Sequence, residues 1–256
     1  MGRVKTPVDT PAGWSVISMG TVDSTNAVAM ELGEKDAPHG TVVAADRQTK
    51  GRGRLGREWV SPAGNIYMSI ILRPALTPTD AALLTMTAAV ASARALRELS
   101  GLNVEIKWPN DLMVSGKKLG GILTEMKSRG RRILFAVVGI GINLNSGADD
   151  FSPELRTTAT SMRIETGKKF PKTGLISQIL NEMEVWYDEL AQGSRERILD
   201  EWRRLSTTLG RSVRITSGNE TLEGIAEALD GDGRLIVRLR SGIQKVISAG
   251  DVTMVR

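Results

Sequence analysis

The stretch NVEIKWPNDLMVSGKKLGGILTEM (residues 103–126) decides how the rest of the sequence is interpreted. It contains three short runs of apolar residues, separated by a Pro-Asn-Asp turn and by the pair Ser115 and Gly116. Turn residues placed between such runs predict a strand, a tight turn, a second strand, another turn and a third strand. The segment therefore predicts part of a β-sheet that carries several lysines.

Strands and helices are expected on both sides of this segment. Further strands are predicted at residues 14–18, 41–45, 64–74 and 132–145. Helical spacing of apolar residues predicts helices at 23–34, 79–101, 175–190 and 194–206, with Ser24 or Thr25, Thr79 and Ser194 as caps. Because the elements do not alternate regularly as βαβ units, the fold class is predicted to be α+β, a mixed sheet flanked by helices.

The last 47 residues differ in texture from the rest of the chain. Short alternating runs are separated by the turn pairs Ser-Gly at 217–218, Asp-Gly at 230–231 and 232–233, and Ser-Gly at 241–242. This pattern is typical of a small all-β barrel. The sequence predicts two domains, residues 1–209 and residues 210–256.

Composition limits the chemistry that is open to this chain. Of its 256 residues 41% are hydrophobic and 25% are charged, which is typical of a soluble globular protein. No apolar run approaches the roughly 20 residues of a membrane span, and no secretory signal is apparent, so a cytoplasmic location is expected. The absence of cysteine and the single histidine, His39, exclude disulfides, thiol nucleophiles and two-histidine metal sites. The net charge of +5 is compatible with anionic partners.

The segment KGRGRLGREW (residues 50–59) packs three glycines and three arginines into seven residues. It matches the dinucleotide pattern G-x-G-x-x-G, but Pro62 and Gly64 follow where that motif requires a helix. Glycine allows a backbone to approach a ligand closely, and arginine binds phosphate or carboxylate through two parallel hydrogen bonds. A nucleotide phosphate, a carboxylate or an RNA backbone would each suit the segment, and a solvated loop is the remaining alternative.

Five motifs occur in a fixed order, and together they resemble the catalytic domain of the biotin protein ligase family. The resemblance covers residues 14–145 in detail and implies a sheet of the class II aminoacyl-tRNA synthetase type. It also implies that biotin and ATP form biotinyl-5′-adenylate, which a lysine of a biotin carboxyl carrier domain of a carboxylase then attacks. Neither step needs a protein nucleophile, in agreement with the composition. The motifs are DSTN (23–26), GRGRLGREW (51–59), KWPNDL (107–112), KLGGILTE (118–125) and VGIGINLN (138–145).

The resemblance assigns two groups of residues to ligands. From the residues alone, the triplet at 24–26 could equally be a plain helix cap, and Trp59 could be a core residue. Lys118, Arg54 and Lys107 are implied as the catalytic cations, and Lys117 is expected to face away from Lys118. Asn110 and Asp111 are implied to hold Mg²⁺ with ATP. The residues implied for biotin are Ser24, Thr25, Asn26, Gln48, Arg52, Gly53, Arg54, Lys118 and Gly120, next to Gly121; those for ATP and the adenylate are Arg54, Arg57, Trp59, Lys107, Asn110, Asp111, Lys118 and Asn143.

Two alternatives and three further expectations accompany this interpretation. The alternatives are a nucleic-acid-binding protein that uses the Gly/Arg segment, and a lipoate ligase-like acyl ligase. Because only thirteen residues precede the first motif strand, a monofunctional ligase without a DNA-binding winged helix is expected. A homodimer could form if the apolar strand at 133–144 pairs edge to edge with a second copy. The Gly/Arg segment is expected to be a mobile lid until a ligand supplies counter-charge, since little inside the protein would order it.

Overall fold

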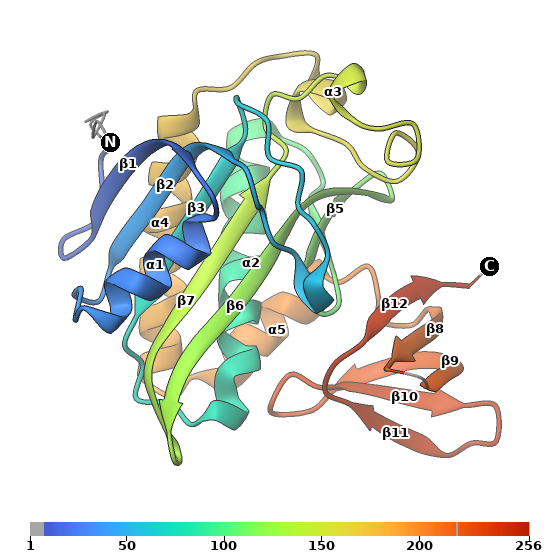
Figure 1. Ribbon diagram of the computed structural model, residues 1–256. Coiled ribbons are helices and arrows are strands. Elements are labelled where there is room, and N and C mark those ends of the chain that lie inside the picture. Colours follow the sequence, from blue (N-terminus) through green and yellow to red (C-terminus); the bar gives the residue numbers. More distant parts are fainter. Residues whose placement is uncertain (1–7, 219, 256) are drawn as a thin grey trace.

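The structure is a computed structural model that describes residues 8–218 and 220–255 of the chain. A large mixed sheet has helices on both faces, and a smaller sheet lies beside it near the C-terminus (Figure 1). The predicted α+β fold with a helix-flanked mixed sheet is therefore confirmed. Within the described residues, no helix is both long enough and apolar enough to cross a bilayer.

The larger sheet contains seven strands among the described residues, in the order β1-β2-β3-β7-β6-β5-β4. Only β1 and β2 of these pair in parallel, because helix α1 carries the chain back between them. The stretch 103–126 forms β4, β5 and β6 as predicted, with Ser115 and Gly116 in the left-handed turn between β5 and β6. The strands are β1 (Ser15–Val22), β2 (Thr41–Gln48), β3 (Ile66–Leu72), β4 (Glu105–Lys107), β5 (Asp111–Val114), β6 (Lys117–Arg129) and β7 (Arg132–Ile142).

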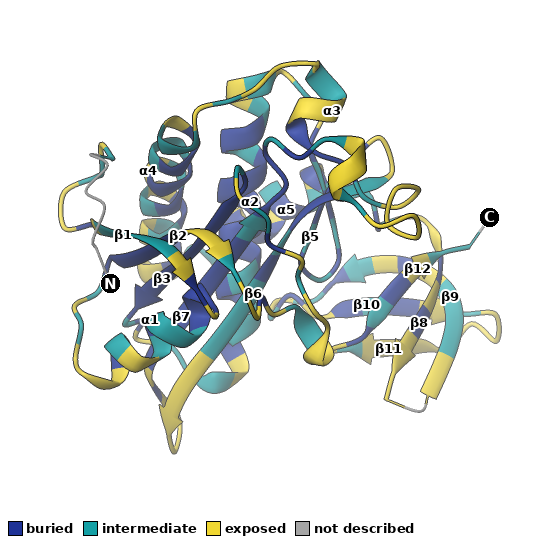
Figure 2. Cartoon of the chain, turned by 45° about the horizontal axis from the view of Figure 1, so that its top comes forward, coloured by how far each residue is buried: buried dark blue, intermediate teal, exposed yellow. Residues whose placement is uncertain are grey.

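Alternation along the strands gives the sheet two buried faces. On β7, Ala136 and Val138 belong to the main core beneath α2, α4 and α5, whereas Phe135 and Val137 belong to a smaller core beneath α1. Successive strand residues point to opposite faces, so a strand that is covered on both sides must be apolar throughout. Figure 2 shows this as continuous burial along the central strands.

The helices follow the predicted positions closely, but the cap of α2 differs. Helix α2 begins at Ala81, after a short 3₁₀ turn, and ends at Gly101 in the left-handed conformation. Thr77 donates from its backbone N–H and its hydroxyl to Oδ2 of Asp80, at 3.1 and 2.7 Å, and Asp80 occupies the N-cap position of α2, so Thr79 is not the cap that the sequence predicted. The helices are α1 (Thr25–Glu34), α2 (Ala81–Ser100), α3 (Met162–Thr166), α4 (Lys172–Ala191) and α5 (Arg195–Leu205).

The C-terminal residues form an antiparallel sheet, but it is open. Its strand order is β11-β10-β9-β8-β12, and within the described residues no ladder joins β11 to β12. The barrel that the turn pattern predicted is therefore not closed, because turn spacing specifies hairpins and not the pairing of the first strand with the last. The strands are β8 (Ser212–Ser217), β9 (Glu220–Leu229), β10 (Leu235–Leu239), β11 (Gln244–Ile247) and β12 (Asp251–Met254).

The strand that suggested a homodimer is not an edge of the sheet. β7 lies between β3 and β6 and is paired along both sides. Strong hydrophobicity in this strand reflects burial on two faces and not a free edge. Edge-to-edge pairing through residues 133–144 is therefore excluded.

Trp108 connects the larger sheet to the C-terminal sheet. Its side chain is fully buried, its backbone N–H donates to Oγ1 of Thr208 at 2.9 Å, and its indole Nε1–H donates to the carbonyl of Gly233 at 3.1 Å. Gly233 lies in the turn between β9 and β10. The backbone and the side chain of one residue thus each satisfy a polar group on a segment that is a hundred or more residues further along the chain.

Replacing Trp108 with Phe should destabilise the fold more than the same change at Trp202. Both side chains are fully buried, but the indole N–H of Trp202 has no hydrogen-bond partner. The Trp108 change leaves a buried carbonyl unsatisfied, which costs about 1–3 kcal/mol beyond the loss of volume that both variants share. Urea unfolding followed by circular dichroism measures the difference, and equal losses of unfolding free energy would contradict it.

Candidate active site

A cavity of about 490 Å³ lies on the face of the larger sheet that α1 also covers. Along β7 this face first presents Phe135 and Val137 beneath α1, and then Gly139 and Gly141 beneath the cavity. Two large side chains are thus followed by two residues without side chains. The cavity exists because these two glycines leave empty the space that the two larger side chains fill further back along the strand.

The Gly/Arg segment folds back on itself over this cavity. Arg52 and Glu58 form an isolated antiparallel bridge, and the tip between them contains a 3₁₀ turn. At the tip, Leu55 and Gly56 both have positive φ angles, 56° and 74°. The side chain of Leu55 is 69% exposed. The segment is a narrow hairpin-like loop (residues 50–59), which agrees with the prediction that no helix follows it.

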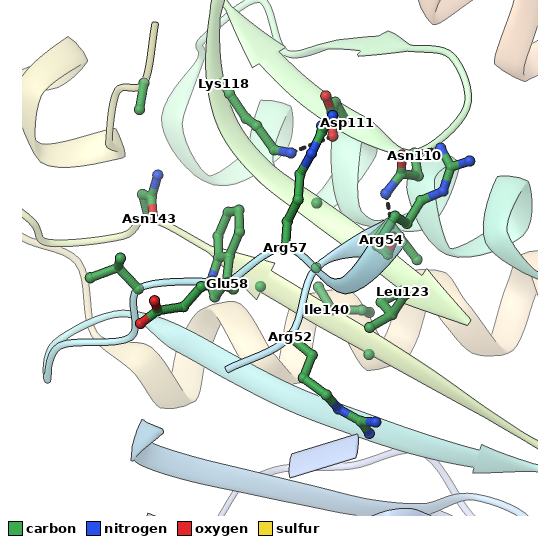
Figure 3. Close-up of a pocket in the computed structure, with 18 of the residues that line it drawn as sticks. Arg52, Arg54, Arg57, Glu58, Asn110, Asp111, Lys118, Leu123, Ile140 and Asn143 are labelled. Atoms are coloured by element: carbon green, nitrogen blue, oxygen red, sulfur yellow. Dashed lines mark hydrogen bonds and ion pairs between the residues drawn. The ribbon is translucent and has the colours of Figure 1, made fainter. Parts of the chain in front are cut away.

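The arginines of this loop all have partners within the protein. The expectation that little inside the protein would order the loop is therefore wrong, because the opposing groups come from segments that are distant in sequence. One acceptor lies on β6, one next to β5, and one on β12 of the C-terminal sheet. Figure 3 shows the acceptor next to β5, Asn110, with Arg54. The pairs are Arg52 with Glu125 (2.9 Å), Arg54 with Asn110 (3.1 Å), and Arg57 with both carboxylate oxygens of Asp251 (3.2 Å from Nη1).

Two lysines from different segments meet one carboxylate: Lys107 and Asp111 belong to KWPND, and Lys118 lies on β6. Oδ1 of Asp111 lies 2.6 Å from the ammonium nitrogen of Lys118, and Oδ2 lies 3.9 Å from that of Lys107. Asn110 is buried, and its side-chain amide donates to the carbonyl of Ile122 at 2.6 Å. The ends of β4 and β5, together with β6, thus place a cation–carboxylate–cation cluster on the cavity wall.

Lys118 faces the cavity and Lys117 does not line it, as strand alternation predicts. The ammonium nitrogen of Lys118 lies 5.5 Å from the centre of the Trp59 ring. Trp59 also lines the cavity, packed against Gly141, and its indole N–H is buried without a partner. Trp59 is thus half-buried at the end of the loop, where its side chain packs against β7.

A separate, neutral group of polar side chains lies where α1 begins. Ser24 occupies the N-cap position without making a side-chain cap bond. Thr25 donates from its backbone N–H and its hydroxyl to Oε1 of Gln48, at 2.8 and 3.1 Å. The side-chain amide of Asn26 donates to the carbonyl of Leu123 at 3.2 Å and to Glu125 at 2.7 Å. All three side chains are buried, and those of Thr25 and Asn26 are tied to the sheet, so the triplet is more than a helix cap.

Gly120 is the predicted site residue that does not line the cavity. A Cβ there would lie 2.7 Å from the carbonyl oxygen of Gly141, so this glycine permits close packing of β6 against β7. Its neighbour Gly121 lines the cavity instead. Gly139 was missed by sequence reasoning; a Cβ there would lie 2.1 Å from Oδ1 of Asn26. The only sequence signal for it was the weak pattern Gly-x-Gly at 139–141.

The cavity extends past the end of β7 and reaches the C-terminal sheet. Asn143 is buried there, and its side-chain amide donates to the carbonyl of Thr160 at 3.0 Å. Tyr67 lines the same wall; burial raises its pKa to about 12, so its hydroxyl stays neutral. Asp251 and Val252 of β12 form part of the opposite wall. Sequence reasoning missed this contribution, because nothing in a short alternating strand indicates what it packs against.

Cations slightly outnumber carboxylates on the cavity wall. Burial lowers the pKa of Arg54, an effect that nearby Asp251 and Asp111 oppose, and an arginine with these neighbours remains charged. His39 is not among the lining residues and packs between Trp14 and Tyr187. Within the described residues, no three His, Cys, Asp or Glu side chains cluster as a metal site would require. The lining cations are Arg52, Arg54, Arg57, Lys107 and Lys118, and the lining carboxylates are Glu58, Asp111, Asp150 and Asp251.

Family models match both parts of the chain. Residues 19–143 match the biotin/lipoate A/B protein ligase family, and residues 208–255 match the biotin protein ligase C-terminal domain. The first match contains all the predicted site residues. The second begins at the segment that leads into β8.

Individual relatives and a solved structure agree with these models. The chain is 39% identical to the bifunctional ligase/repressor BirA of Bacillus spizizenii, over 93% of this chain and 73% of that protein. It is 35% identical to the biotin–[acetyl-CoA-carboxylase] ligase of Paracoccus denitrificans, over 90% and 96%. The biotin protein ligase of Aquifex aeolicus, solved with biotin and ATP, superposes with a TM-score of 0.80 at 29% identity, covering 94% of this chain and 98% of that one. Fold, cavity and sequence lead to one conclusion: the chain belongs to the biotin protein ligase family.

Proposed function

We propose that this chain is an enzyme that joins biotin to ATP as biotinyl-5′-adenylate, and then transfers biotin to a lysine of a biotin carboxyl carrier domain. The relatives named as biotin–[acetyl-CoA-carboxylase] ligases and the likeness to a structure holding biotin and ATP support this function. They do not support the nucleic-acid-binding or lipoate ligase alternatives.

One observation carries the proposal: the cavity joins a buried, neutral polar pocket to a cluster of five cations. A substrate with an uncharged polar head at one end and a carboxylate at the other fits such a cavity, and ATP supplies the phosphates for the cations. The direct test is biotin-dependent exchange between ATP and labelled pyrophosphate, which needs no acceptor protein. A purified chain that shows no such exchange would contradict the proposed function.

The neutral pocket is proposed to hold the biotin head. A ureido ring offers one carbonyl acceptor and two N–H donors, and it needs partners of both kinds. Ser24, Thr25 and Asn26 offer hydroxyl and amide groups at the start of α1, and Gln48 fixes Thr25 through two hydrogen bonds. Gly139 leaves the space beside Asn26 open. Arg52 and Gly53 close the pocket from the loop side.

The cations are proposed to stabilise the adenylation step. A carboxylate oxygen of biotin attacks the α-phosphorus of ATP, the bond from phosphorus to the bridging oxygen breaks, and pyrophosphate leaves with the electron pair. Negative charge accumulates on the phosphate oxygens, and cations that are already in place stabilise it without reorganising. Lys118, Arg54 and Lys107 are proposed for this role, with Arg57 beside them. Trp59 and Asn143 are proposed to flank the adenosine.

In the second step the acceptor lysine attacks the acyl carbon of the adenylate. The bond between that carbon and the phosphate oxygen breaks, AMP leaves, and the amine loses its proton to solvent. Positioning and exclusion of water account for such a step without a protein nucleophile. The single histidine, His39, lies away from the cavity wall and the chain has no cysteine, which supports a mechanism of this kind.

Magnesium was expected at Asn110 and Asp111, but these residues do not fit a metal held by the protein. They carry oxygen atoms of the kind that Mg²⁺ prefers. Arg54, however, donates to the amide oxygen of Asn110, and two lysines pair with Asp111. We propose instead that Mg²⁺ enters with ATP as part of the substrate.

Other expectations remain proposals. The division into residues 1–209 and 210–256 is supported by the two separate sheets and by the second family model. A cytoplasmic location is likewise proposed. Lack of promoter recognition also stays a proposal, and a competition assay with promoter DNA tests it. A homodimer also stays a proposal, and it cannot form through β7, since this strand is paired along both sides.

Replacing Lys118 with Ala should reduce adenylate formation by about 10²–10³-fold, the usual loss for one preorganised electrostatic contact. The matched control is Lys117→Ala, which removes a neighbouring lysine that does not line the cavity and should be nearly silent. Biotin-dependent ATP–pyrophosphate exchange measures both. Equal losses in the two variants would contradict the assignment of Lys118.

Replacing Gly139 with Ala should weaken biotin binding selectively. The added methyl group would overlap Oδ1 of Asn26 and force it out of the head pocket. The KM for biotin should rise by about tenfold or more, equivalent to about 1.4 kcal/mol, while the KM for ATP stays within about twofold. Gly20→Ala is the control, since a Cβ there meets nothing within 4 Å. A normal biotin KM in the Gly139 variant would argue against this position for the biotin head.

Trypsin should cut the loop at residues 50–57 more slowly when biotin and ATP are bound. Lys50, Arg52, Arg54 and Arg57 are all cleavage sites, and a ligand would add counter-charge to that of the protein partners. The exposed β6–β7 turn, with basic residues at 129, 131 and 132, is an internal control that ligands should not protect. Mass spectrometry of early digests follows each site. Equal loop cleavage with and without saturating ligands would exclude a ligand-ordered lid.

A further inference from the structure

Glu125 contacts two parts of the site although it does not line the cavity itself. It lies on β6, two residues beyond Leu123 and four beyond Gly121, and both of these line the cavity. Between Leu123 and Glu125, Thr124 accepts a hydrogen bond from the hydroxyl of Thr85 on α2, at 2.8 Å. Since neighbouring strand residues point to opposite faces, Glu125 points away from α2, toward α1 and the loop.

One oxygen of Glu125 accepts hydrogen bonds from two donors. Its Oε2 lies 2.7 Å from Nδ2 of Asn26 and 2.9 Å from Nη2 of Arg52. Asn26 is buried at the start of α1, whereas Arg52 belongs to the loop that covers the cavity. The carboxylate therefore joins the floor of the head pocket to the lid above it.

The contact with Asn26 fixes the orientation of its side-chain amide. A carboxylate and a backbone carbonyl can only accept, so Glu125 and the carbonyl of Leu123 both require the nitrogen of the amide. The oxygen is thereby turned the other way, where the hydroxyl of Ser69 donates to it at 2.6 Å and where it lies over Gly139. Without Glu125, one of the two amide hydrogens would be buried without a partner.

The contact with Arg52 fixes the part of the loop that precedes its tip. Arg54 and Arg57 carry like charges within a few residues, and each is drawn to a different partner, Asn110 or Asp251. Glu125 is the ion-pair partner that the described structure gives to Arg52. This pair is half-exposed, so it determines where the loop rests more than how stable the fold is.

We propose that Glu125 is a positioning residue that couples occupation of the head pocket to closure of the loop over it. Because Asn26 and Arg52 share one oxygen atom, the orientation of the amide and the position of the arginine depend on the same side chain. A ligand that engages Asn26 then favours the arrangement in which Arg52 is in place, and the lid closes over biotin before ATP is bound. The proposal rests on the proposed function, since it takes biotin as the occupant.

The test compares the wild-type chain with Glu125→Ala and Glu125→Gln in biotin-dependent ATP–pyrophosphate exchange. Glu125→Ala should raise the KM for biotin by about tenfold or more, the usual scale for a lost charged hydrogen bond, and leave the KM for ATP within about twofold. Glu125→Gln keeps the shape and one acceptor oxygen, so its biotin KM should lie between those of the other two. Protection of the loop from trypsin by biotin alone should weaken in the same order.

Glu34→Gln is the matched control, because Glu34 pairs with Lys127 at 3.1 Å on the exposed surface and the change in charge is the same. It should behave as the wild type does in both assays. Unchanged biotin KM and loop protection in both Glu125 variants would overturn the proposal, as would equal rises in both KM values together with a lower melting temperature. Absence of exchange in the wild-type chain would contradict the proposed function instead, which distinguishes the two failures.

Discussion

Five cations converge on one cavity, and their mutual repulsion is the constraint on which the rest of the site depends. Two unit charges about 4 Å apart interact by about 4 kcal/mol near a protein surface, so such a cluster needs opposing groups even without a ligand. The chain supplies them from three places: Glu125 on β6, Asp111 at the start of β5, and Asp251 on β12. A charged ligand therefore meets a site that is already neutralised in part, and it must compete for the cations it binds.

The shape of the cavity follows from a simpler feature of the large sheet. Along one face of β7, Phe135 and Val137 fill the space beneath α1, and Gly139 and Gly141 then leave it empty. A strand keeps its direction whichever side chains it carries, so this change of residue size forms a pocket without a change of backbone. The same strand thus supports the core at one end and forms the floor of the cavity at the other.

Much of the fold and site was predictable from sequence, because the relevant signals are local. The turn at Ser115 and Gly116, the helix that ends at Gly101 and the position of Lys118 on the cavity face all follow from turn residues and strand alternation. What was not predictable depends on pairing between distant segments. Alternation from Lys118 would place Gly120 on the cavity face, but a register shift in the pairing of β5 with β6 brings Gly121 there instead, and Gly120 meets the backbone of β7.

The same limit explains the errors about the loop and the two sheets. The loop was expected to lack internal partners, since nothing near residues 50–59 reveals Glu125 or Asp251. Hydrophobicity alone does not distinguish a central strand from an exposed edge, so the sequence leaves the place of residues 133–144 in the sheet open. The barrel was predicted from hairpin turns that leave the pairing of β11 and β12 undetermined.

The pairing of Arg57 with Asp251 has a consequence for how the protein is made. The two residues are 194 positions apart in the chain. Ribosomes synthesise about 5–20 residues per second, so the partner of Arg57 is added roughly 10–40 s after the arginine itself. During that interval the nascent chain can already form the pocket beneath α1, while the wall provided by β12 is still missing. The cavity wall that β12 provides is therefore completed later than the walls provided by the larger sheet.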